Sequence, residues 1–200
     1  MTTSGERNLR ILLADEDRDA LHHLCQVLEG LGHEVTPFAV SVAEAVELIA
    51  REDPDVAFVV IHDDDQHALA LISETVEYAS GPVLASGLSE PEFVARAAEM
   101  GIAGYVDSDN PEAVQAAIEV AVRRHREAAR LMEKVDQLQS ALDRRAVIER
   151  AKGILMERHG VDERQAFELL RQQARRSNRR VIDLALAVAD GHALLPGRAE

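Results

Sequence analysis

The chain is poor in aromatic residues and in cysteine. Aromatic residues make up 3% of its 200 residues and Trp is absent, which argues against proteins that read single strands by stacking bases on aromatic platforms. The single cysteine, Cys25, cannot form an intramolecular disulfide, and its apolar helical surroundings predict a small buried side chain.

Long apolar runs are also missing. No charge-free stretch approaches the ~18 residues of a membrane span, and the first ten residues lack the apolar centre of a signal peptide. We therefore expect a cytoplasmic protein without a membrane partner. The sequence has no nucleophile–base pair, glycine-rich phosphate loop or His/Cys metal spacing, so we expect no enzyme activity and no required cofactor.

Positive charge is scarce in the first part of the chain and concentrated in the second. Residues 1–122 hold 5 Lys+Arg, none of them Lys, against 24 Asp+Glu, a balance of −19. Residues 123–200 hold 17 against 12, and the stretch 144–180 alone holds 11 against 5. A phosphate backbone would be repelled by the first part and attracted to the second. This contrast predicts two domains with different partners.

The first part alternates short apolar runs with amphipathic segments. The apolar runs predict strands over 9–15, 33–38, 56–61, 82–87 and 103–108, each followed by a helix. Such βα repeats with short connections predict an α/β, flavodoxin-like, five-stranded parallel sheet. Ligands of these sheets bind outside the carboxyl ends of the strands.

The second part is predicted to be all helical. From Pro111 to about His159 there is no glycine before Gly153 and no further proline, which predicts one long helix or two end to end. Asp162 is expected to cap the next helix, with four apolar residues inward, and a last helix covers 178–195; with the end of the long helix these form a three-helix unit. The four inward residues are Ala166, Phe167, Leu169 and Leu170.

The middle of the long helix carries apolar residues at alternating spacings of three and four. This is the coiled-coil period, sustained for about two heptads. It predicts a dimeric or intramolecular coiled coil, with an exposed connecting helix as the alternative. The residues are Ala128, Leu131, Val135, Leu138 and Leu142.

Two parts of the chain each resemble a known protein family. Residues 1–122 resemble a response-regulator receiver domain in topology, in the acidic cluster ADED at 14–17 and in EMGIAGYV at 99–106. The last ~55 residues resemble the ANTAR domain, carried by AVIERAKGILMERHGVDERQAFELLRQQA at 146–174. The chain would then divide into a receiver at 1–122, a coiled-coil linker at 123–143 and a three-helix ANTAR domain at 144–200.

The ANTAR resemblance implies a transcription antitermination regulator that binds hairpins in nascent mRNA as a homodimer. The residues expected to contact RNA are those projecting from the basic helices and two small residues that permit close approach. For the small residues the alternative is helix packing, and for the arginine run it is a solvated face. The set is Arg145, Arg150, Ala151, Lys152, Gly153, Arg171, Arg175, Arg176, Arg179 and Arg180.

The receiver resemblance is incomplete at the phosphorylation pocket. Such a pocket needs acidic residues for Mg²⁺, an Asp nucleophile, a Ser or Thr and a Lys. Asp15 and Glu16 can supply the metal ligands and Ser86 the hydroxyl, but Val60 occupies the nucleophile position and Ser108 the Lys position. We therefore expect a pseudo-receiver that docks a protein partner.

Three alternatives remain open at this point. The receiver could be phosphorylated by a histidine kinase at a loop residue such as Asp63, although this residue lies three positions beyond Val60. The basic helices could bind duplex DNA, since a three-helix unit also fits a major groove. The chain could also be a protein-interaction adaptor without a nucleic-acid ligand.

Overall fold

A computed structural model describes residues 8–15, 18–36, 38–61, 65–87 and 91–193. The chain divides into two compact units, residues 1–129 and 130–200. This boundary falls inside the segment expected as a linker, while the finer three-part division stays a prediction.

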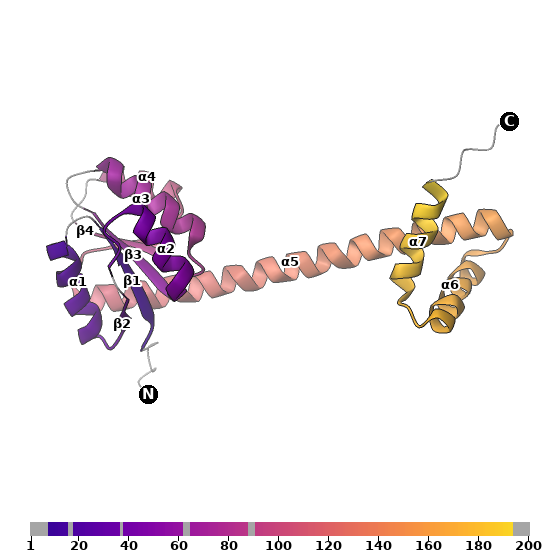
Figure 1. The fold of residues 1–200 in the computed structure, drawn as a ribbon, viewed down its shortest axis with the longest axis horizontal. Helices are drawn as coiled ribbons and strands as arrows, with labels where there is room; N and C mark the ends of the chain where they lie inside the picture. Colours follow the sequence, from indigo (N-terminus) through magenta and orange to yellow (C-terminus); the bar gives the residue numbers. More distant parts are fainter. Residues whose placement is uncertain (1–7, 16–17, 37, 62–64, 88–90, 194–200) are drawn as a thin grey trace. The chain divides into compact units, whose positions relative to one another are not determined.

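The first unit is an alternating α/β fold with five strands and their helices (Figure 1). All pairings are parallel and the strand order is β2-β1-β3-β4-β5, which is the predicted flavodoxin-like topology. The elements are β1 (Arg10–Ala14), α1 (Arg18–Gly30), β2 (Glu34–Val35), α2 (Val42–Glu52), β3 (Val56–Ile61), α3 (Asp65–Tyr78), β4 (Val83–Gly87), α4 (Pro91–Glu99), β5 (Gly104–Val106) and α5 (Pro111–His159).

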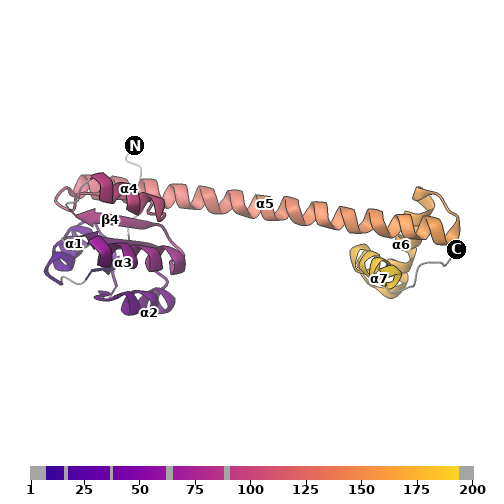
Figure 2. The same ribbon diagram turned by 90° about the horizontal axis from the view of Figure 1, so that it is seen from above.

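The sheet is covered on both faces, as the two views show (Figure 1 and Figure 2). Every residue of β3 is buried, which explains why this strand reads as an uninterrupted apolar run. Its side chains alternate between two cores: Phe58 and Val60 pack with α1 and α5, and Val59 and Ile61 pack with α2, α3 and α4.

The second strand is shorter than predicted. The apolar pattern predicts a strand over 33–38, but the paired residues are only Glu34 and Val35, followed by a single bridge between Ala14 and Ala39. Pro37 lies outside the described residues. β2 is an edge strand, and only β1 pairs with it, so few ladder hydrogen bonds define its length.

Helix α5 is one uninterrupted helix of 49 residues, which resolves the question left open by the sequence. It supplies Val114 and Ile118 to the core of the first unit and Ala151 to the core of the second. No helix within the described ranges is long and apolar enough to cross a membrane.

The second unit packs α6 (Glu163–Ser177) and α7 (Val181–Ala193) against the end of α5 (Figure 1). A full capping box opens α6, since Asp162 accepts from the Gln165 N–H and Gln165 accepts from the Asp162 N–H. The cluster of buried residues at its centre is small and consists of Ala151, Leu170 and Ala185. Ala166 and Leu170 are buried as predicted, whereas Phe167 and Leu169 are partly exposed, so the inward face of α6 is narrower than expected.

Candidate functional site

The carboxyl edge of the sheet holds the residues expected at a phosphorylation pocket. Asp15 follows β1 and is buried, and Ser86 in β4 is fully buried. The Ser86 hydroxyl makes no hydrogen bond to any described residue. Ser108 lies beyond the end of β5 and is half-buried.

Val60 is the residue that the sequence predicts at the nucleophile position of the receiver. It lies within β3, is 5% exposed, and pairs in register with Ser86 of β4. Glu16 and Asp63, the other acidic residues named for this pocket, lie outside the described residues. No group of three or more His, Cys, Asp or Glu side chains in the described part of the chain could hold a metal ion. Asp15 alone cannot supply the several oxygen ligands of Mg²⁺.

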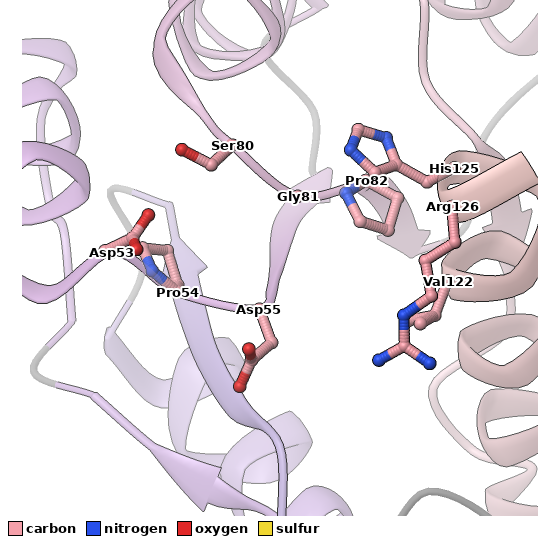
Figure 3. Close-up of a pocket in the computed structure, with 9 residues that line it drawn as sticks. All are labelled: Asp53, Pro54, Asp55, Ser80, Gly81, Pro82, Val122, His125 and Arg126. Carbon is pink, nitrogen blue, oxygen red and sulfur yellow. The ribbon is translucent and has the colours of Figure 1, made fainter. Parts of the chain in front are cut away.

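A second hollow lies at the opposite, amino edge of the same sheet (Figure 3). It has a volume of about 180 Å³ and is lined by the loops that precede β3 and β4 and by three residues of α5. The loops approach closely because Gly81 has no Cβ; an added Cβ would lie 2.2 Å from the Asp55 carbonyl oxygen. The Asp55 carboxylate accepts from the Arg10 N–H at 2.8 Å. The lining of this hollow therefore includes the acidic side chains of Asp53 and Asp55 and the basic side chains of His125 and Arg126.

The arginines predicted to bind nucleic acid meet in the second unit. Four of them line one open hollow of about 560 Å³ at the end of α6, the following turn and the start of α7. The turn is made possible by Asn178, whose left-handed backbone (φ 51°, ψ 40°) ends α6. The lining residues are Arg171, Ala174, Arg175, Asn178, Arg179, Arg180 and Val181; we call this surface the arginine hollow.

Two of these arginines are held by neighbouring carboxylates. Arg171 contacts Glu168 at 2.7 Å, and Arg180 donates from Nε and Nη2 to the two oxygens of Asp183, each at 3.2 Å. The bidentate hydrogen bonds raise the pKa of Arg180 and lower the pKa of Asp183. Among the described residues, Arg175, Arg176 and Arg179 form no ion pair, although Arg179 is near enough to Asp183 to help lower the pKa of that carboxyl group.

Lys152 does not project toward solvent, so the expectation for this residue is wrong. Its side chain is 9% exposed, and Nζ donates to Glu149 at 2.7 Å and to Glu163 at 2.5 Å. These contacts, that with Glu149 first, raise the pKa of Lys152. A buried ammonium is costly unless it is paired, so Lys152 joins α5 to the first residue of α6.

The remaining predicted contacts lie on α5. Arg145 and Arg150 are exposed there, as a contact surface requires. Ala151 is fully buried in the three-helix core, so the helix-packing alternative holds for it. Gly153 faces open space, since a Cβ built on it would meet nothing within 4 Å. Helix packing within the described part of the chain therefore does not require a glycine at position 153.

Comparison with known proteins assigns the chain to a family. A family model described as the ANTAR domain matches residues 136–188. The chain is 30% identical over 182 residues to the transcriptional regulatory protein PdtaR of Mycobacterium tuberculosis, a match that covers 88% of this chain and 89% of that protein. The chain belongs to the family of response regulators with an ANTAR domain.

Two further matches cover single parts of this ANTAR response regulator. The aliphatic amidase regulator of Pseudomonas aeruginosa is 39% identical over 59 residues, 30% of each chain. The signal receiver domain of a modulated diguanylate cyclase from Desulfovibrio desulfuricans G20 matches with a TM-score of 0.54 and 21% identity, over 60% of this chain and 98% of that one. This likeness shows the fold alone and confirms the receiver fold. The chain is thus an antitermination-type regulator with a receiver domain.

Proposed function

We propose that this ANTAR response regulator binds hairpins in nascent mRNA through the arginine hollow, as a homodimer, and thereby controls transcription termination. The observation that carries the proposal is the convergence of four arginines on one open surface. Arginine guanidinium groups bind phosphate oxygens in a bidentate manner, and each contact releases counterions.

The helix geometry at the arginine hollow supports an anionic ligand. Val181 is the first residue of α7 and lines the hollow, so the amino end of that helix opens into it. A helix amino terminus carries a positive partial charge and free N–H groups, which favour phosphate. The carbonyls at the end of α6 are instead engaged by the turn, because the Asn178 and Arg179 N–H groups donate to Ala174.

The apolar face of α5 supports the homodimer. Its large members, from Leu131 to Leu142, are 61–66% exposed, which is unusual for leucine and valine in a monomer. In heptad terms Ala128, Val135 and Leu142 fall at a positions and Leu131 and Leu138 at d positions, which is the apolar spacing of a coiled coil. We call this face the α5 seam; it comprises Ala128, Leu131, Val135, Leu138 and Leu142.

Pairing along the α5 seam would leave both arginine hollows open. Ala151 and Leu155 point toward α6 and α7, and they follow Val135 by 16 and 20 residues. At 3.6 residues per turn, those positions lie about 160° and about 200° around the helix from Val135. The seam and the face that packs α6 and α7 are thus opposite sides of α5, so a second copy does not cover the RNA surface.

The receiver is proposed to act without aspartyl phosphorylation. The buried Val60 cannot accept a phosphoryl group, and the hydroxyl of Ser108 replaces the ammonium that would neutralise it. The retained fold would then serve as a docking surface for a protein partner. Phosphorylation by a histidine kinase at Asp63 is the competing possibility.

Replacing Arg175 and Arg179 together by Ala should weaken binding to a stem–loop RNA and lower the slope of log K against log salt. Each phosphate contact contributes roughly one unit of slope, so the expected loss is about two. The measurement is fluorescence anisotropy over a salt series. Arg51→Ala, an exposed receiver arginine paired with Glu47 and Glu52, is the matched control and should change neither quantity. An unchanged slope in the double variant would support the adaptor alternative.

Incubation of the full chain with acetyl phosphate and Mg²⁺ should give no one-phosphate mass increase in intact-mass spectrometry. The reason is that the nucleophile position is a buried valine. A phosphorylatable receiver treated in parallel is the positive control. A mass increase that disappears in the Asp63→Ala variant would show that the loop carboxylate replaces the missing nucleophile, and the proposal for the receiver would be abandoned.

Leu131→Glu combined with Leu138→Glu should convert a dimer into a monomer in sedimentation equilibrium, because four carboxylates would face one another across the α5 seam. Ser140→Glu, about 140° from Val135 on the same helix, should leave the dimer intact. On RNA with two hairpins the double variant should lose the ~10²–10⁴-fold gain of bivalent binding, while affinity for a single hairpin stays unchanged. A wild-type chain that sediments as a monomer at high concentration would contradict the seam.

A further inference from the structure

The small hollow at the amino edge of the receiver sheet has no part in the proposed function. It is lined by the loops that precede β3 and β4 and by one side of α5, and its volume is about 180 Å³ (Figure 3). We call it the amino-edge hollow. Pockets for drug-sized ligands measure roughly 300–1,000 Å³. The space here therefore suits a smaller molecule, of the size of a simple metabolite.

The lining of the amino-edge hollow combines a buried apolar part with an exposed polar part. Pro54, Pro82 and Val122 are buried, and they offer an apolar surface to an occupant. The polar members of the lining are all exposed, so they can reach the charged groups of a water-soluble ligand. They are Asp53, Asp55, Ser80, His125 and Arg126.

The polar lining carries both signs of charge, on separate elements. Asp53 and Asp55 come from the loop after α2, whereas His125 and Arg126 come from α5, and Gly81 lies between the two pairs (Figure 3). A simple anion would be repelled by the carboxylates and a metal cation by the guanidinium group. The described side chains include no group of three or more acidic, His or Cys residues that could hold a metal. A zwitterion matches both pairs.

The acidic side of the hollow is fixed in place by Arg10, at the start of β1. The Arg10 guanidinium donates to the Asp53 carbonyl at 2.6 Å, and the Arg10 N–H donates to the Asp55 carboxylate at 2.8 Å. The Asp53 carboxylate itself has no hydrogen-bond or ion-pair partner among the residues that the structure describes. A ligand ammonium group can therefore pair with Asp53 at little cost in ordering the protein.

We propose that the amino-edge hollow binds an α-amino acid with a short aliphatic side chain. The ammonium group lies against the Asp53 carboxylate and the Ser80 hydroxyl. The ligand carboxylate accepts from Arg126, whose planar guanidinium matches it, and from His125. The aliphatic side chain packs on Val122. This site goes beyond the proposed RNA binding, because its occupant would join the loop before β3 to the helix that continues into the second unit.

The test measures the binding of L-alanine, L-valine and L-leucine to the full chain by isothermal titration calorimetry. We expect saturable binding of at least one of them with a Kd of about 1 mM or tighter. Two analogues of valine test the charges: isobutylamine lacks the carboxylate and isovalerate lacks the ammonium group. Each should bind about tenfold more weakly or worse, because one side of the hollow is left without its partner. No saturable binding up to about 20 mM, or equal binding of either analogue, would overturn the proposal.

Two substitutions locate the site. Arg126→Gln and Asp53→Asn should each weaken amino-acid binding about tenfold, and asparagine keeps the left-handed backbone (φ 44°) that position 53 adopts after α2. Arg124→Gln is the matched control, since this exposed arginine does not line the hollow, and it should bind like the wild type. Circular dichroism checks that each variant is folded. Undiminished binding in both lining variants would place the ligand elsewhere and contradict the proposal.

Discussion

The fold depends on the continuity of helix α5. One helix supplies Val114, Ile118 and Ala121 to the receiver core and Ala151 to the three-helix core. A break between these segments would cost the backbone hydrogen bonds of a helix interior, and between Pro111 and Gly153 the sequence has neither a proline nor a glycine. The stretch of α5 between the two cores is therefore helical although it packs against neither core. Its exposed apolar seam is the surface that we propose binds a second copy of the chain.

Charge separates the two units as clearly as the fold does. The receiver has a strongly acidic composition, whereas four arginines of the second unit lie around one turn. Asn178 is central to that arrangement, because its left-handed backbone brings residues from α6 and from the start of α7 to the same hollow.

Much of the fold could be predicted because buried positions recur at regular intervals along helices and strands, so the apolar residues of the sequence show the same spacing. The apolar run of β3 and the helical spacing in α6 are such patterns, and both elements formed within a residue or two of expectation. β2 was overestimated, since strand length at a sheet edge depends on its neighbour rather than on local composition. Counting along β3 assigned Val60 to the nucleophile position, and in the structure Val60 pairs with Ser86 of β4.

The functional surfaces were predicted less completely, and Lys152 shows why. A lysine on a helix is expected to be exposed, and only the packing of α6 reveals that Glu163 meets it. The arginine run was visible as charge, but which arginines share a hollow depends on the Asn178 turn. The hollow lined by Leu169, Leu184 and Val188 could not be predicted, because Leu169 fits a core-facing pattern and the space depends on how α5, α6 and α7 pack together.

The most direct test of the account is an equilibrium competition at fixed salt. The full chain is bound to a labelled stem–loop RNA and challenged with unlabelled stem–loop RNA or with duplex DNA of equal charge. The account predicts that the hairpin RNA displaces the label at much lower concentration than the duplex, because we propose that the arginine hollow binds an RNA hairpin. Equal or better displacement by duplex DNA would contradict RNA hairpin recognition and favour a DNA-binding regulator.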